Sequence, residues 1–272
     1  MAEKKVLKAY ENDQFIQSRD GRILRIMSEF IEPQSRLEDQ KISDTIVFFG
    51  SARAKPLDEA LAQYEDAKEG KNDLTIAAAE KAIEMAKYYE QARELSFKLT
   101  EWSKELEENR KRFVICTGGG PGMMEAANRG ASEARGKNMG FNISLPFEQG
   151  SNPWVTNSLS FEFHYFFMRK FWFAYLAKAI IIFPGGFGTF DELFEVLTLI
   201  QTKKMEKKVP LILFGSKFWD DVFNFDKLAE WGVISPKDLN LFYRTDDVDD
   251  AFNYLTEELN KHALAKPGEG LK

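Results

Sequence analysis

Short apolar segments alternate with amphipathic segments along most of the chain. Segments with the length and composition of strands lie at 45–49, 113–116, 139–145, 159–163, 179–183, 209–214 and 241–245. A short continuous apolar run is typical of a strand that is buried on both faces. Because such segments alternate with helical ones, the pattern predicts an α/β fold: a Rossmann-like open parallel sheet with helices on both faces.

The intervening segments carry apolar residues at helical spacing. Helices are predicted at 20–32, 56–110 with a break near 69–73, from the glycines at 117–122 to Arg135, 166–178, 189–202, 217–230 and 248–262. Pro33 is expected to end the first of these helices, because proline lacks the N–H that continues a helix. In the second, Leu95, Leu99 and Trp102 share one face, which predicts that this face is buried.

The predicted elements divide the chain into three parts. Residues 1–44 form an N-terminal helical extension, residues 45–265 a Rossmann-like nucleotide-binding domain, and residues 266–272 a disordered tail. The domain contains a helical insertion at about 57–87. A chain of 272 residues is long enough to bury a full core.

Two glycine-rich turns follow predicted strands, at 117–122 and 184–189. Ligands of open parallel sheets bind at the carboxyl ends of strands, where glycines let the backbone approach a phosphate closely. The two turns therefore predict a phosphate-containing ligand, although each could also be a tight strand-to-helix turn without a ligand. Neither matches the motifs that hold dinucleotides or triphosphates.

Charged residues near the second turn have two interpretations. Thr189 and Glu192 match a helix capping box, which would account for the glutamate without any catalytic role. Arg169 and Lys170 lie on an aromatic helix, where a cation either extends to solvent or binds an anion. His164 is expected to be a packed, hydrogen-bonded imidazole.

Charge and composition exclude several other classes of protein. The net charge of −6, with no basic stripe, argues against a nucleic acid polymer as partner. The densest basic cluster, at 203–208, is expected to be a solvated connection. With one cysteine, Cys116, in an apolar run, and two distant histidines, neither a disulfide nor a zinc site is expected. No signal peptide or membrane span is evident, so we expect a cytoplasmic protein that does not contact a membrane.

Several segments together resemble the Lonely Guy family of nucleoside 5′-monophosphate phosphoribohydrolases, which are often mislabelled as lysine decarboxylases. The matching segments are FGSAR at 49–53, TGGGPGMMEAANRGA at 117–131, FNISLPFEQ at 141–149, FHYFFMRK at 163–170 and PGGFGTFDELFEVLTLIQT at 184–202. The helix at 22–32 is similar to the N-terminal extension of the longer bacterial members. The insertion at 57–87 departs from the family pattern.

The resemblance implies a function and a set of site residues. The function is hydrolysis of the N-glycosidic bond of a nucleoside 5′-monophosphate, AMP or a cytokinin-type nucleotide, to free base and ribose 5-phosphate, without cofactor or metal. By resemblance the catalytic pair is Arg169 and Glu192. The implied substrate-binding residues are Ser51, Gly119, Gly120, Met168, Lys170, Gly185, Gly186, Gly188 and Thr189. The alternative is a noncatalytic nucleotide-binding, carrier or signalling protein of the same fold.

The aromatic helix at 166–178 has more apolar surface than one sheet face requires. Part of it is therefore expected to be buried against a second subunit, which predicts a homodimer or a higher even homo-oligomer.

Overall fold

The central feature of the fold is a seven-stranded parallel sheet with the strand order β4-β3-β2-β1-β5-β6-β7. A computed structural model describes residues 6–70, 72–106, 110–145 and 150–264. The strands are β1 (Thr45–Phe49), β2 (Val114–Thr117), β3 (Asn138–Ile143), β4 (Ser160–Phe163), β5 (Ala177–Ile182), β6 (Leu211–Phe214) and β7 (Tyr243–Thr245). Every neighbouring pair is parallel, so the predicted α/β fold class is confirmed. The predicted tail at 266–272 lies outside the described residues.

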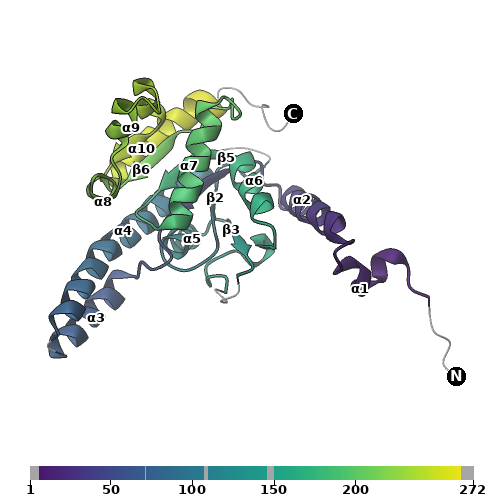
Figure 1. Cartoon of the computed structure of the whole chain (residues 1–272), viewed down its shortest axis with the longest axis horizontal. Coiled ribbons are helices and arrows are strands. Elements are labelled where there is room, and N and C mark those ends of the chain that lie inside the picture. The colour runs from purple at the N-terminus through teal and green to yellow at the C-terminus, as the bar shows by residue number, and fades with distance from the viewer. Residues whose placement is uncertain (1–5, 71, 107–109, 146–149, 265–272) are drawn as a thin grey trace.

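Helices connect the strands and cover both faces of the sheet (Figure 1). They are α1 (Asp13–Ile16), α2 (Arg22–Asp39), α3 (Leu57–Glu69), α4 (Asp73–Lys104), α5 (Met123–Glu133), α6 (Phe166–Leu176), α7 (Phe187–Gln201), α8 (Ser216–Val222), α9 (Phe225–Glu230) and α10 (Val248–Leu259). The single helix predicted at 217–230 is in fact two, because Asn224 begins α9 by accepting the N–H of Lys227. None of the described helices has the length and apolar character required to cross a bilayer.

The two faces of the sheet bury separate cores. Successive strand residues point to opposite faces, so Val47 packs with α6 and α7 whereas its neighbour Ile46 packs with α4, α5 and α10. Cys116 is fully buried, as expected for a small apolar residue. Leu95 and Leu99 of α4 are also fully buried, which confirms the predicted helix face.

The insertion is a helical hairpin. In Figure 1, α3 and the first half of α4 run side by side and project away from the sheet. Gly70 follows the end of α3, and Asn72 caps α4 by accepting the N–H of Leu74. The second half of α4 packs on the sheet next to α5.

The N-terminal helix α2 does not end at Pro33, contrary to the sequence prediction, but continues to Asp39. Proline leaves the carbonyl of Glu29, four residues earlier, without its helical partner. The indole Nε1 of Trp172 in α6 donates a hydrogen bond to that carbonyl at 2.9 Å. Phe30 packs beside Trp172, with their ring centroids 5.8 Å apart. The helix therefore passes through the proline because α6 supplies the missing donor.

The basic cluster at 203–208 is only partly a solvated connection. Lys207 is half-buried, and its Nζ donates to the carbonyls of Ala174 and Tyr175, both at 2.7 Å. These carbonyls belong to the last turn of α6, so Lys207 satisfies acceptors that the helix itself leaves open. Burial, together with the nearby charge of Lys178, lowers the pKa of Lys207 to about 7.

Candidate functional site

Three turns meet at the carboxyl edge of the sheet, because β2, β1 and β5 are neighbours and parallel. The loop after β1 lies between the two glycine turns and contacts both. The N–H of Ser51 donates to the carbonyl of Pro184 in the second turn at 2.9 Å. The carbonyl of Ser51 accepts the N–H of Met123, just after the first turn, at 3.0 Å. Ser51 thus joins the two turns through its backbone.

The first glycine turn is packed into the protein. Gly119 and Gly122 have φ angles of +72° and +75°, which residues other than glycine rarely adopt. A Cβ atom at Gly122 would lie 2.2 Å from the carbonyl oxygen of Ser51. The buried amide of Asn152 donates to the carbonyls of Gly119 and Gly120, both at 3.0 Å. The turn itself therefore requires these glycines.

The second glycine turn faces open space. A Cβ atom at Gly186 or Gly188 would meet no atom within 4 Å. Gly186 precedes the first residue of α7, and no side chain caps this helix. The unpaired N–H groups at the start of α7 are therefore available to an anion.

The predicted capping box at Thr189 and Glu192 is wrong. Gly186 occupies the N-cap with an extended backbone, so α7 begins at Phe187, two residues before Thr189. Glu192 consequently lies beyond the first turn and has no capping role. Its side chain is buried, with a relative exposure of 7%.

A cavity of about 920 Å³ lies between these turns, which is large enough for a nucleotide. One side is formed by the β1 loop and the start of α7. The rest of the lining combines apolar side chains with Arg169 and Glu192. The lining residues are Phe49, Gly50, Ser51, Ala52, Arg53, Gly118, Met124, Arg169, Phe173, Gly186, Phe187, Gly188, Thr189, Phe190, Glu192 and Val222.

Glu192 and Arg169 both line the cavity, and Lys170 lies behind the glutamate. The Nζ of Lys170 is 3.3 Å from Glu192 Oε1 and also contacts Asp191 at 2.8 Å and Glu195 at 2.6 Å. Arg169 Nη2 is 3.9 Å from Glu192 Oε1, which is too long for a hydrogen bond. Lys170, rather than Arg169, is therefore the cation nearest to the glutamate.

Burial decides the electrostatics of this cluster. Desolvation raises the pKa of Glu192, although the charges of Lys170 and Arg169 oppose it. Desolvation also lowers the pKa of Arg169, against the attraction of Glu192. For Lys170, desolvation is outweighed by its acidic neighbours Asp191, Glu195 and Glu192, so that its pKa is raised. The buried Nε of Arg169 has no hydrogen-bond partner within the described part of the chain.

The structure places the site residues expected from the sequence in two groups. Those that line the cavity are Ser51, Arg169, Gly186, Gly188, Thr189 and Glu192. Those outside the lining are Gly119, Gly120, Met168, Lys170 and Gly185. Gly185 packs against its own turn, since a Cβ there would lie 2.1 Å from Thr189 Oγ1. Met168 lies in α6 and is buried in the core.

The lining also includes residues that sequence reasoning missed. Arg53 belongs to the FGSAR segment, so its position after β1 was a usable signal. Val222 comes from α8, and nothing in its sequence context indicates the site.

His164, which was expected to be packed, is exposed and contacts the ring of Tyr165. Among the described residues, no group of three or more His, Cys, Asp or Glu side chains could hold a metal ion.

The sequence of the chain is similar to a family model and to several known proteins. Residues 124–255 match a family model described as possible lysine decarboxylase. The chain is 36% identical over 125 residues to a pyrimidine/purine nucleotide 5′-monophosphate nucleosidase of Escherichia coli K12, covering 42% of this chain and 26% of the nucleosidase. It is 34% identical over 89 residues to a probable cytokinin riboside 5′-monophosphate phosphoribohydrolase of Oryza sativa subsp. japonica, covering 33% and 39% of the two chains.

The chain thus spans about a quarter of the length of that nucleosidase and about two fifths of the rice protein. A solved structure, the molybdenum cofactor binding protein of Rippkaea orientalis, is similar at a TM-score of 0.47 and 17% identity, covering 79% of this chain and 96% of the other. Over residues 124–255, the family model and the sequence relatives confirm the resemblance to the Lonely Guy family that is seen in the motifs.

Proposed function

We propose that this chain hydrolyses the N-glycosidic bond of nucleoside 5′-monophosphates, AMP or cytokinin-type nucleotides, to free base and ribose 5-phosphate. The observation that carries the proposal is a buried carboxylate, Glu192, which faces a cavity of nucleotide size beside the uncapped start of a helix. The names of the two sequence relatives support the same reaction class.

The 5′-phosphate would bind at the second glycine turn. Gly186 and Gly188 leave space for it, and the unpaired N–H groups at the start of α7 favour a negatively charged group there. Arg53 at the edge of the cavity adds a positive charge. This binding energy, remote from the reacting bond, would orient the ribose.

Glu192 would act on the anomeric carbon. When the bond between C1′ and the base nitrogen breaks, positive charge develops on the sugar, and a carboxylate stabilises it. The oxygen of a water molecule then bonds to C1′, and its proton leaves through Glu192 while the base takes up a proton as it departs. A pKa raised by burial suits a group that must accept a proton near neutral pH.

Lys170 and Arg169 would divide two tasks. Lys170 lies outside the cavity lining and contacts Glu192, so it would favour the ionised carboxylate against the desolvation that raises the pKa of Glu192. Arg169 makes no hydrogen bond to Glu192, so its planar guanidinium is available to bind the nucleotide.

The first experiment measures base release from a panel of nucleoside 5′-monophosphates by chromatography. Glu192→Gln should lower turnover about 100-fold or more, because the carboxylate is lost while its shape is kept. Glu230→Gln is the control, since Glu230 is exposed on α9 and pairs with Lys227. Wild-type turnover in Glu192→Gln on every nucleotide that the parent cleaves would contradict the assignment.

A second comparison tests the phosphate site. AMP should be cleaved far more efficiently than adenosine, because adenosine lacks the group that the second turn binds. Equal efficiency on the two substrates would contradict the proposed phosphate site.

The competing function is a noncatalytic nucleotide binder or carrier. The same turns would hold the ligand, but such a protein has no need of a buried carboxylate beside two cations. Tight binding of AMP with no release of adenine, in the parent chain, would favour the carrier.

We also propose that the protein is a homo-oligomer. Part of the aromatic surface of α6 is covered by α2 of the same chain. Phe166 and Phe167 of α6 and Ile23, Met27 and Ile31 of α2 remain exposed. Exposed apolar residues in this number favour a subunit interface. Light scattering that shows only monomer would reject the proposal.

A further inference from the structure

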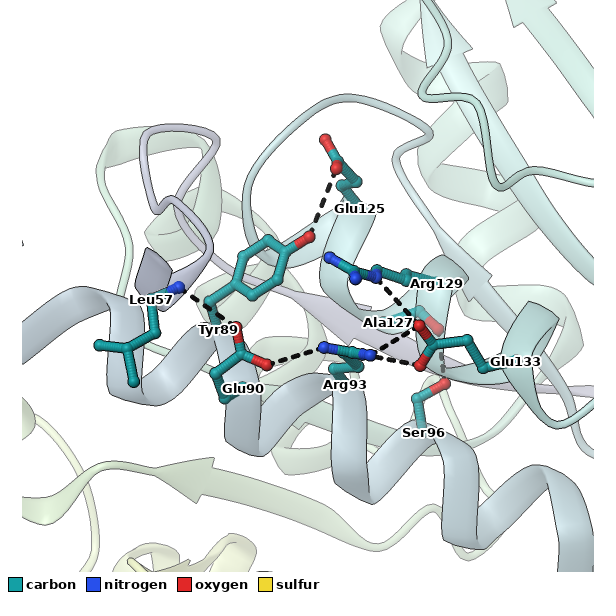
Figure 2. A network of polar contacts seen from close by, with 9 residues as sticks. All are labelled: Leu57, Tyr89, Glu90, Arg93, Ser96, Glu125, Ala127, Arg129 and Glu133. Carbon is teal, nitrogen blue, oxygen red and sulfur yellow. Dashed lines mark hydrogen bonds and ion pairs between the residues drawn. The ribbon is translucent and has the colours of Figure 1, made fainter. Parts of the chain in front are cut away.

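A network of charged side chains connects the helical insertion with the body of the protein (Figure 2). At its centre is Glu90 of α4, and its carboxylate makes two contacts. Oε1 accepts the backbone N–H of Leu57, the first residue of α3, at 3.2 Å. Oε2 accepts a hydrogen bond from Arg93 Nη1 at 3.1 Å.

Glu90 supplies the start of α3 with a side-chain acceptor that the N-cap residue, Pro56, lacks. The residue before α3 is Pro56, which has no side-chain acceptor, and no residue of its own turn caps the helix. The first N–H groups of a helix need acceptors and are stabilised by negative charge. Glu90, thirty-three residues later, supplies the acceptor for the Leu57 N–H, and its charge adds to those of Asp58 and Glu59 in the first turn of α3.

The carboxylate of Glu90 is itself held from the opposite side. Arg93 makes a bidentate contact with Glu133 of α5, with both distances at 2.7 Å. Arg129 Nε also donates to Glu133, at 3.0 Å. Figure 2 shows this chain of contacts running from α3 across α4 to α5. Arg129 and Glu133 lie in the second half of α5, the helix that follows the first glycine turn, so the network joins the start of α3 to the body of the protein through α4 and α5.

Between these fixed points lies the loop from Ser51 to Pro56. At its start, the backbone of Ser51 bonds to both glycine turns. At its end, Leu57 bonds to Glu90. Arg53 lies in between and lines the cavity, and within the described residues its guanidinium has no ion pair or hydrogen bond. Its backbone N–H donates to Ser51 Oγ at 3.1 Å and the next residue, Ala54, is buried in the core, so the position of Arg53 depends on these contacts together with the two ends of the loop.

We propose that Glu90 is a positioning residue for binding of the substrate phosphate: through Leu57 it holds the loop at 51–56 so that Arg53 faces the anion at the second glycine turn. The proposal rests on the proposed function in one respect, namely that the ligand carries a phosphate. It gives the insertion, which departs from the family pattern, a role in substrate affinity.

The test measures the dissociation constant of ribose 5-phosphate by calorimetry on the full chain, alongside the kinetics of base release. Glu90→Ala should weaken binding of ribose 5-phosphate five- to tenfold and raise KM for AMP by a similar factor, with kcat nearly unchanged. Glu90→Gln keeps an acceptor for the Leu57 N–H and should recover most of the affinity. The matched control is Glu94→Ala, one turn further along α4, where the exposed carboxylate pairs with Lys98.

A double-mutant cycle identifies the route of the effect. Arg53→Ala alone should weaken the binding of ribose 5-phosphate. Adding Glu90→Ala to Arg53→Ala should weaken this binding little further, because both changes remove the same interaction. Additive effects would overturn the proposal. So would an equal loss in Glu94→Ala, an unchanged dissociation constant in Glu90→Ala, or no binding of ribose 5-phosphate by the parent. If Glu90→Ala does not fold, Arg93→Lys takes its place, because it removes the bidentate contact with Glu133 and keeps the charge.

Binding and turnover separate the two proposals. Weaker binding in Glu90→Ala together with no base release from any nucleotide would support the positioning role and reject the hydrolase. Base release that depends on Glu192, together with an unchanged affinity for ribose 5-phosphate in Glu90→Ala, would support the hydrolase and reject the positioning role.

Discussion

The two glycine turns look alike in sequence but differ in what surrounds them. In the first, added Cβ atoms at Gly119 and Gly122 would collide with Asn142 and with the backbone of Ser51. In the second, added Cβ atoms at Gly186 and Gly188 would meet nothing. The glycines of the first turn are needed by the fold, whereas the space at the second is left for something outside the protein.

The polar groups around the turns differ in the same way. The carbonyls of the first turn are bound by the neutral amide of Asn152, and Thr117 pairs with Asn128 nearby. Around the second turn the groups are charged, and the start of α7 has no cap. A glycine-rich turn is therefore evidence for a ligand site only when its backbone groups are left unpaired.

The largest expected effect comes from the first turn. Gly122→Ala should lower the free energy of unfolding by about 3 kcal/mol or more, because it forces alanine to a φ of +75° and brings its Cβ to 2.2 Å from a backbone oxygen. Urea denaturation measures this change. A loss below about 1 kcal/mol would show that the turn can relax, and the comparison between the two turns would fail.

The second turn should respond in activity and not in stability. Gly188→Ala is expected to leave the free energy of unfolding unchanged or to raise it by up to about 1 kcal/mol, since alanine is the better helix residue. The added methyl would occupy space that the phosphate requires, so kcat/KM should fall about tenfold, or about 1.4 kcal/mol. A variant that loses stability and keeps kcat/KM would reverse the roles of the two turns.

The smallest expected effect is a shift in pH dependence. Lys170→Met removes a cation 3.3 Å from Glu192, so the pKa of this carboxyl should rise further. Because the ionised form is active, the acidic limb of the kcat/KM profile should move up by about one pH unit, with activity regained at higher pH. Glu125→Gln, on α5 beside the first turn, is the control and should leave the limb in place. An unmoved limb in Lys170→Met would mean that Lys170 does not set the charge of Glu192.

Most of the fold could be predicted from the sequence because the strands are buried on both faces. In β1, the four residues after Thr45 are apolar and Gly50 follows them, so this run has few alternatives to a central parallel strand. The start of α7 could not be predicted in the same way. Thr189 and Glu192 have the spacing of a capping box, but the extended backbone at Gly186 starts the helix earlier, and sequence spacing does not report backbone angles.

The site shows the same division. The glycines, Arg169 and Glu192 stand in motifs, so they could be named from the sequence, and their roles remain predictions. The contact between Lys170 and Glu192 joins α6 to α7, and the position of Val222 depends on how α8 packs. Such contacts depend on tertiary structure, and no local spacing encodes them.

Pro33 has a consequence for how the N-terminal helix can move. A helix packed through apolar contacts alone can slide or rotate by small steps, because one ridge of side chains resembles the next. Here one carbonyl, that of Glu29, is left open by the proline, and one donor, the indole of Trp172, fits it. A shift of α2 by a single residue would turn this carbonyl about 100° away from its donor. The hydrogen bond between the Trp172 indole and the Glu29 carbonyl, which Pro33 leaves without a helical donor, thus fixes α2 in a single register on α6.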